Sequence, residues 1–211
     1  MTKKKKIILV IAAIVVLILL CLIGKFIYDK TTQKIEIPVK TIEVLDSISG
    51  YNYKLEDRDT SLYKEKFLKL KEVLENEKID KKEYVSLLAE LFVIDLYTID
   101  NKNSKYDVGA LEFIYPEEEE KFSNMVMDSM YKLVEDNSEN KRTQELPVVS
   151  NTKITKIENA KYSKGTTSFD GYKVYINIEY EKELDYDKNI IITIIEEEEK
   201  MYVVSILSEE L

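Results

Sequence analysis

The chain has 211 residues, of which 45% are hydrophobic and 34% charged, a composition typical of a globular protein with room for one anchor and one domain. It contains no histidine, and its single cysteine, Cys21, lies in an apolar N-terminal run. Histidine-dependent relays, histidine metal sites, and disulfides or thiol nucleophiles in the rest of the chain are therefore excluded.

A lysine cluster that ends at Lys6 precedes an uninterrupted apolar run from Ile7 to Ile23, which Lys25 follows closely. As a helix this run would be about 26 Å long at about 1.5 Å per residue, close to the thickness of a bilayer core. We expect a transmembrane helix over residues 7–24, with Lys6 and Lys25 reaching the two interfaces. The lysines indicate a cytoplasmic N-terminus and an extracytoplasmic domain on the cell membrane.

A cleaved signal peptide and a lipoprotein are the alternatives to this anchor. A signal peptide has a shorter apolar region that ends at a small-x-small site, whereas Cys21, Leu22 and Ile23 occupy those positions. Lipoprotein processing needs a small side chain before the cysteine, and Leu20 stands there. We therefore favour an uncleaved anchor, with residues 1–6 as the cytoplasmic part and membrane lipid as its partner.

Charge is distributed unevenly along the chain. Residues 1–30 carry a net charge of +5 and residues 31–211 a net charge of −14, which together give the chain's net charge of −9. A domain this acidic would repel phosphates, so we expect no nucleic acid among its partners. Proteins, cations and basic surfaces are the expected partners, and the oligomeric state stays open.

Residues 25–58 are expected to form a stalk and a small β-hairpin. The two strand-like runs are Ile42–Leu45 and Tyr51–Leu55, and Gly50 lies in the turn between them. Such a hairpin could pack on the domain that follows.

Three amphipathic helices follow the hairpin. The first begins after the capping candidates Asp59 and Thr60, and the second begins at Asp80, three residues before Glu83, as in a capping box. The third begins at Pro116. The second helix is apolar nearly all round and should be central. The expected core positions of the first and third helices are Tyr63, Phe67, Leu70 and Leu74, and Phe122, Val126, Met130 and Leu133.

The hydrophobic period changes from helical to two after residue 145. A first strand contains Ile154 and Ile157, and a second, from Tyr172 to Tyr180, alternates strictly. Two more runs, Asn189–Ile195 and Met201–Leu207, complete a set of strands with short links, which favours an antiparallel meander. Helices followed by such a sheet predict an α+β domain.

The order of elements from Asp59 to Leu211, including the closing pair "NIIITIIEEEEKMYVVSIL", resembles the nuclear-transport-factor-like, cystatin-like cone. In that fold, helices pack into the concave face of a curved antiparallel sheet. The anchor with a cone over residues 59–211 is similar to the bitopic assembly proteins of conjugation and type IV secretion machines. That resemblance implies a non-catalytic scaffold.

Asp95, in the apolar stretch "LFVIDLYTID", is the one weak candidate for a catalytic residue. A carboxylate buried there would have a raised pKa and could act as a base, as an aspartate does in some cone-fold isomerases and dehydratases. The simpler interpretation is that Asp95 accepts hydrogen bonds from nearby backbone, lysine or tyrosine. The loop from Asp100 to Gly109 has polar oxygens but not the spacing of a calcium loop.

The acidic runs Glu117–Glu120 and Glu196–Glu199 are interpreted as a helix start and a hairpin turn, with a patch for a cationic partner as the alternative. Since no second catalytic residue can be assigned, we predict no enzyme, metal or cofactor. The sequence favours an extracytoplasmic protein-interaction module, and the resemblance implies a secretion or conjugation scaffold. A binding domain for a small ligand or cell-envelope component, with a cavity between the second helix and the sheet, is the alternative.

Overall fold

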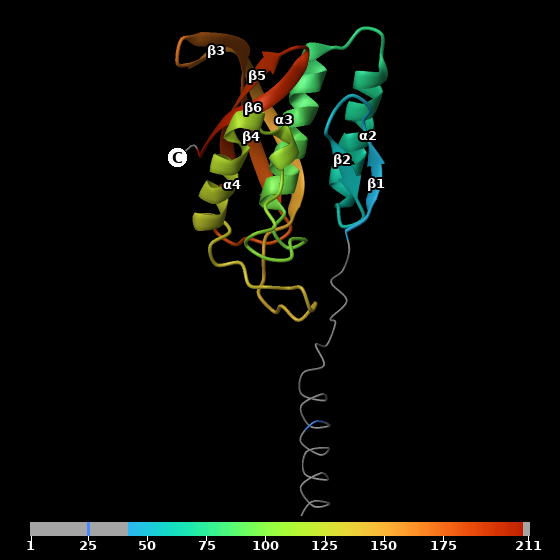
Figure 1. The fold of residues 1–211 in the computed structure, drawn as a ribbon, viewed down its shortest axis with the longest axis vertical. Helices are drawn as coiled ribbons and strands as arrows, with labels where there is room; N and C mark the ends of the chain where they lie inside the picture. Colours follow the sequence, from blue (N-terminus) through green and yellow to red (C-terminus); the bar gives the residue numbers. More distant parts are fainter. Residues whose placement is uncertain (1–24, 26–41, 209–211) are drawn as a thin grey trace, which may run out of the picture. The chain divides into compact units, whose positions relative to one another are not determined.

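The computed structural model describes Lys25 and residues 42–208, and residues 42–208 lie in one α+β unit (Figure 1). Within these residues there are three α-helices, two short 3-10 helices and six strands. In chain order they are β1 (Val44–Ser47), β2 (Lys54–Glu56), α2 (Ser61–Glu75), α3 (Lys81–Tyr97), η1 (Leu111–Phe113), η2 (Pro116–Glu118), α4 (Glu119–Asp128), β3 (Val149–Lys164), β4 (Thr167–Tyr180), β5 (Asn189–Glu197) and β6 (Lys200–Ser208).

The cytoplasmic residues 1–6 and the transmembrane helix expected over residues 7–24 lie outside the described residues. No helix in the part that the structure describes combines the length and the apolar character that a membrane span requires.

The four C-terminal strands form an antiparallel sheet in the order β3-β4-β5-β6, which confirms the predicted meander. Its core face is the one that the alternation in β4 predicts, because Val174, Ile176 and Ile178 are buried. The β3–β4 pair is longer than the rest of the sheet, since β5 pairs with β4 only from Gly171 onward. The tip of this hairpin therefore extends beyond β5 (Figure 1).

The central helix is α3, as its nearly continuous apolar sequence predicts. Twelve of its 17 residues are buried, including Leu88, Leu91 and Phe92, which are fully inaccessible. Asp80 caps the helix by accepting hydrogen bonds from the backbone amides of Lys82 and Glu83, so the predicted start is confirmed. This helix contributes more buried apolar side chains to the core than any other described element.

The first predicted helix is α2, which packs against α3. Thr60 is its N-cap and accepts from the amide of Tyr63 at 3.2 Å. Tyr63, Phe67 and Leu70 are buried as expected, and Leu74 is partly buried against the same core.

The third predicted helix differs from the expectation at both ends. Its first turn is the separate 3-10 helix η2, and α4 ends at Asp128, before Met130 and Leu133, although Met130 is still partly buried against the core as expected. Leu133 is 80% exposed, while Tyr131 and Val134 are buried in its place. Beyond the end of the helix, the hydroxyl of Tyr131 donates to the backbone oxygen of Leu96 on α3 at 2.7 Å.

The N-terminal hairpin forms and packs on this core. Strands β1 and β2 pair antiparallel, and Gly50 lies in the connecting turn with a φ of 82°. The hydroxyl of Tyr53 contacts that of Tyr84 on α3 at 2.7 Å and donates to the backbone oxygen of Met201 at 3.2 Å. The amide of Met201 donates in turn to Tyr84, also at 3.2 Å. This three-residue contact joins the hairpin, α3 and β6.

Candidate functional site

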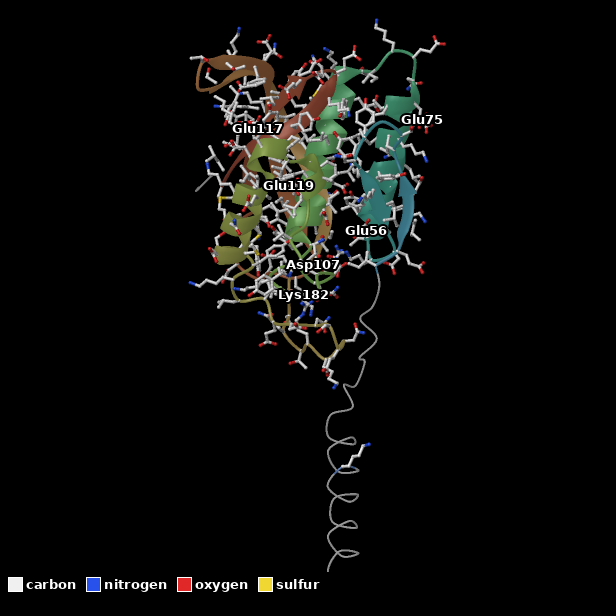
Figure 2. All side chains as sticks on the ribbon, viewed as in Figure 1. Glu56, Glu75, Asp107, Glu117, Glu119 and Lys182 are labelled. Atoms are coloured by element: carbon white, nitrogen blue, oxygen red, sulfur yellow. The ribbon has the colours of Figure 1, made fainter. Side chains whose placement is uncertain are left out.

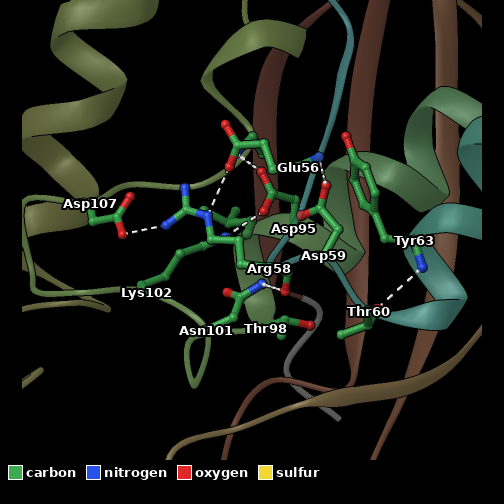
Figure 3. A network of polar contacts seen from close by, with 12 residues as sticks. Glu56, Arg58, Asp59, Thr60, Tyr63, Asp95, Thr98, Asn101, Lys102 and Asp107 are labelled. Atoms are coloured by element: carbon green, nitrogen blue, oxygen red, sulfur yellow. Dashed lines mark hydrogen bonds and ion pairs between the residues drawn. The ribbon is translucent and has the colours of Figure 1, made fainter. Parts of the chain in front are cut away.

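The most polar hollow described by the structure lies between β2, the C-terminal part of α3 and the loop that leads to η1 (Figure 3). It is an open pocket of about 360 Å³. The lining residues are Asn52, Lys54, Glu56, Arg58, Asp59, Tyr63, Asp95, Val108, Gly109, Ala110, Leu111, Glu112 and Glu119. Charged side chains such as Glu56 and Asp107 come together here from segments far apart in the sequence (Figure 2).

The catalytic candidate Asp95 lies in this pocket, on the last turns of α3. Its Oδ1 accepts a hydrogen bond from Nζ of Lys102, and its Oδ2 accepts one from the backbone amide of Ala110. The side chain of Lys102 is 0% exposed and that of Asp95 is 17% exposed, so the ion pair is largely shielded from water. Both carboxylate oxygens are thus already bound.

Burial by itself raises the pKa of Asp95. The charge and hydrogen bond of Lys102, the amide of Ala110 and the charge of Arg58 outweigh it, so the pKa lies below its ordinary value. The raised pKa that the apolar sequence around Asp95 predicts is therefore wrong, because Lys102 neutralises the buried charge. An ionised carboxylate of low basicity with both oxygens occupied is suited to fastening the loop to the helix.

A second ion-pair group crosses the mouth of the pocket. Arg58 donates from Nε to Oε2 of Glu56 at 2.8 Å and from Nη1 to Oδ2 of Asp107. The same oxygen of Asp107 accepts from the amide of Asn103 at 2.7 Å, and Nδ2 of Asn101 donates to the backbone oxygen of Arg58 at 3.3 Å. These contacts attach the segment after β2 to the loop after α3.

Two other carboxyl groups of the pocket have raised pKa values. Burial, with the nearby charge of Asp95, raises the pKa of Glu112 to about 8 and that of Asp59 to about 6. Glu112 accepts from the amide of Lys54 at 3.0 Å and from the hydroxyl of Tyr63 at 3.2 Å. These two groups, and not Asp95, are the carboxyls that change charge near neutral pH.

Gly109 lets the loop approach α3 closely enough for the amide of Ala110 to reach Asp95. A Cβ at Gly109 would lie 2.5 Å from the backbone oxygen of Asp95 and 2.9 Å from Cε of Lys102. The next residue, Ala110, has a φ of 63°, a left-handed conformation that turns its amide toward Asp95. The sequence indicates a turn at Gly109 but not the contact that requires the glycine.

The loop from Asp100 to Gly109 is a structural part of the site. Its Asp107 and Lys102 are both engaged in the ion pairs described above. No group of three or more carboxylate, histidine or cysteine side chains arranged to hold a metal lies within the part of the chain that the structure describes.

The two acidic runs lie at a helix start and a hairpin turn, as predicted. Glu117 and Glu118 are in η2, where Lys164 at the end of β3 bridges them at 2.8 and 2.7 Å. Glu198 and Glu199 form the β5–β6 turn with positive φ values of 49° and 66°. Part of the first run is thus neutralised within the chain.

Comparison with protein family models, with curated proteins and with solved structures finds no match to this chain. The geometry of residues 42–208 therefore carries the functional argument by itself.

Proposed function

We propose that the chain is a non-enzymatic protein-interaction module, held at the cell membrane by its N-terminal apolar segment and displayed outside the cytoplasm. The apolar run with its flanking lysines supports the anchor, and the charge of −14 over residues 31–211 supports a basic or protein partner.

The observation that carries the proposal is the packing between α3 and the sheet. Leu88, Leu91 and Phe92 of α3, and Val174 and Ile192 of the sheet, are all 0% exposed and belong to one core. A cone-type enzyme or a ligand carrier needs a cavity at this place. Since side chains fill it and Asp95 is held by Lys102 and Ala110, the interior supports a scaffold better than a catalyst.

A part in a secretion or conjugation machine is the sharper form of the proposal. It rests on the resemblance in layout to bitopic assembly proteins with a cone-like domain, and the order of helices followed by an antiparallel sheet supports it.

Chemical cross-linking in intact cells, followed by detergent purification and mass spectrometry, tests the proposal. We expect links from lysines of residues 42–208 to one or a few membrane-associated proteins. A chain that cross-links to nothing and runs at monomer mass would contradict the interaction role.

A binding domain for a small ligand is the second candidate, and the pocket beside Asp95 is the observation that favours it. Five carboxyl-bearing residues line the pocket, against the cations Lys54 and Arg58, so a small cation is the matching ligand. Thermal unfolding of the full chain with and without spermidine tests this. A saturable increase in Tm that Glu119→Gln abolishes would favour the second candidate, and no increase would leave the pocket a structural feature.

A further inference from the structure

The β3–β4 hairpin ends in a two-stranded arm, formed by residues 161–170 (Figure 1). Gly171 is the last residue of β4 that pairs with β5, where its partner is Ile195. Within the described part of the chain, the backbone of the arm therefore pairs only between its own two strands. A two-stranded hairpin without a third strand is marginally stable in water, so the position of the arm depends on side-chain contacts.

Side chains of the arm attach it to the chain around η2. Nζ of Lys164 lies 2.8 Å from Oε2 of Glu117 and 2.7 Å from Oε1 of Glu118. The same ammonium group lies 5.3 Å from the ring centroid of Tyr115, the residue before η2. Phe169 of the arm contacts this ring as well, at a centroid distance of 6.1 Å. The end of the arm is thus held by both ionic and aromatic contacts.

These contacts enclose a second apolar cluster on the outer face of the sheet, the face opposite to α3. Ile195 lies on this face, because its neighbour Ile194 is in the core and successive side chains of a strand alternate. The partner of Ile195 in β6 is Tyr202, which packs edge-on against Tyr115 with ring centroids 5.6 Å apart. Ile195 is 1% exposed and Tyr115 is 8% exposed, although neither belongs to the core cluster beside α3.

A comparison along β5 indicates that the arm supplies this cover. Ile191 lies on the same face as Ile195 but is partly exposed. Gly171, the partner of Ile195 in β4, has no side chain, and the next residue of β4 on this face is Phe169 of the arm. Ile195 is therefore shielded from water by the arm and by the tyrosines that the arm contacts.

The ionic attachment of the arm is weak. The side chains of Lys164 and Glu117 are 36% and 69% exposed, and exposed ion pairs contribute little to stability and are screened by salt. A two-stranded arm held in this way can open at a free energy well below that of global unfolding. Opening would expose Ile195 and Tyr115 while the core beside α3 stays intact.

We propose that the arm is a strap that opens and closes over the outer face of β5 and β6, and that the ion pairs of Lys164 with Glu117 and Glu118 fasten it. Low ionic strength holds the strap closed, and high ionic strength releases it and uncovers the apolar surface around Ile195. This inference does not rest on the proposed interaction function, because it concerns a motion within the domain.

Thiol labelling of the full-length chain in detergent tests the proposal, with Cys21→Ser as the background. Ile195→Cys places a thiol under the strap, where a water-soluble maleimide reaches it only when the strap is open. We expect labelling in about 1 M sodium chloride to be at least about fivefold faster than in about 0.01 M, because the Debye length falls from about 30 Å to about 3 Å. Equal rates at the two salt concentrations would overturn the proposal.

Two lysine variants, each combined with Ile195→Cys, locate the fastening. Lys164→Met removes the ion pairs to η2, whereas Lys161→Met removes a pair with Asp170 that lies within the arm, with 3.5 Å between Nζ and Oδ1. We expect Lys164→Met to raise the low-salt labelling rate at least about fivefold and to remove its salt dependence, and Lys161→Met to leave both unchanged. Equal effects of the two variants would overturn the role of Lys164.

A thiol on the opposite face of the sheet distinguishes strap opening from unfolding of the domain. Val174→Cys changes a residue that is 0% exposed and belongs to the core cluster. Labelling at this position requires global unfolding, so we expect it to stay slow at both salt concentrations and in combination with Lys164→Met. An increase at position 174 equal to that at position 195 would overturn the strap, because the whole domain would then be unfolding.

Discussion

At the scale of single residues, the Asp95–Lys102 pair is the contact on which the pocket depends. Lys102 is enclosed completely, and an enclosed ammonium without a counter-charge is costly. Asp95 supplies that counter-charge and also holds the loop through Ala110. The pair therefore links the end of α3 to the segment that carries Glu112.

We predict that Asp95→Asn destabilises the domain by about 3 kcal/mol, because it leaves the buried charge of Lys102 without a partner. Urea denaturation of the full chain measures this loss. In Asp95→Asn/Lys102→Met the buried charge is gone as well, so the double variant should be more stable than the sum of the two single variants predicts. An Asp95→Asn variant as stable as wild type would contradict the structural role of the pair.

Glu112 should make stability depend on pH in the opposite sense to an ordinary carboxylate. Its pKa is about 8 in the folded chain, against an ordinary value of 4.5, so the folded state binds more protons between these two values. Stability from this group is complete below about pH 4.5 and is lost as the pH rises toward 8.

We predict that Glu112→Gln raises the free energy of unfolding at pH 9 by about 2 kcal/mol and has little effect at pH 4, since the amide keeps an acceptor oxygen but cannot ionise. Urea unfolding across this pH range measures the difference. Asp59→Asn is the control, because the pKa of Asp59 is about 6 and its effect should level off at lower pH. A pH-independent difference between Glu112→Gln and wild type would contradict the raised pKa.

At the scale of elements, the segment after α4 is where the periodic sequence pattern and the observed packing disagree on which residues are buried. The periodic pattern places Leu133 in the core, whereas the structure exposes it and buries Val134. We predict that Leu133→Ala changes stability by less than about 0.5 kcal/mol and that Val134→Ala costs about 1–2 kcal/mol. Chemical denaturation of both variants measures this. A larger loss of stability for Leu133→Ala would support the longer helix that the periodic pattern predicts.

The helices, the strands and their order follow from local signals in the sequence. Thr60 and Asp80 cap helices where their side chains predict it, and the alternation around Val174 gives the buried face of β4. The end of α4 does not follow, and the segment beyond it is held by a hydrogen bond from Tyr131 to the distant Leu96. No local pattern reveals such a bond.

The pocket could be predicted only in part. Asp95 is visible as a carboxylate in an apolar stretch, but its partners come from two other segments, Lys102 and Ala110 from the loop after α3 and Arg58 from the segment after β2. Arg58 and Glu112 belong to no sequence motif. Lys102 has the sequence context of an ordinary loop lysine, and only the folded structure shows that it pairs with Asp95. The pKa of Asp95 therefore depends on tertiary contacts that the sequence pattern does not contain.

At the scale of the whole molecule, the extracytoplasmic, membrane-anchored placement that we propose for the domain can be tested directly. Cys21 is the one cysteine of the sequence and falls in the expected anchor, so a cysteine introduced elsewhere can be labelled selectively. We predict that Leu133→Cys, at a position 80% exposed, reacts with a membrane-impermeant maleimide in intact cells, whereas wild type does not. Labelling that requires permeabilised cells would contradict the extracytoplasmic placement.

The contact between Tyr53, Tyr84 and Met201 has a consequence for the order in which the chain can fold. Tyr53 is synthesised early, yet one of its hydrogen-bond partners lies 148 residues later, in the last strand. Before β6 is synthesised, the hydroxyl of Tyr53 can contact that of Tyr84 on α3 but lacks its hydrogen bond to the backbone of Met201. A chain truncated before Met201 would therefore lack the contacts that join the hairpin to β6, and we expect proteases to cleave its hairpin more readily than that of the full chain.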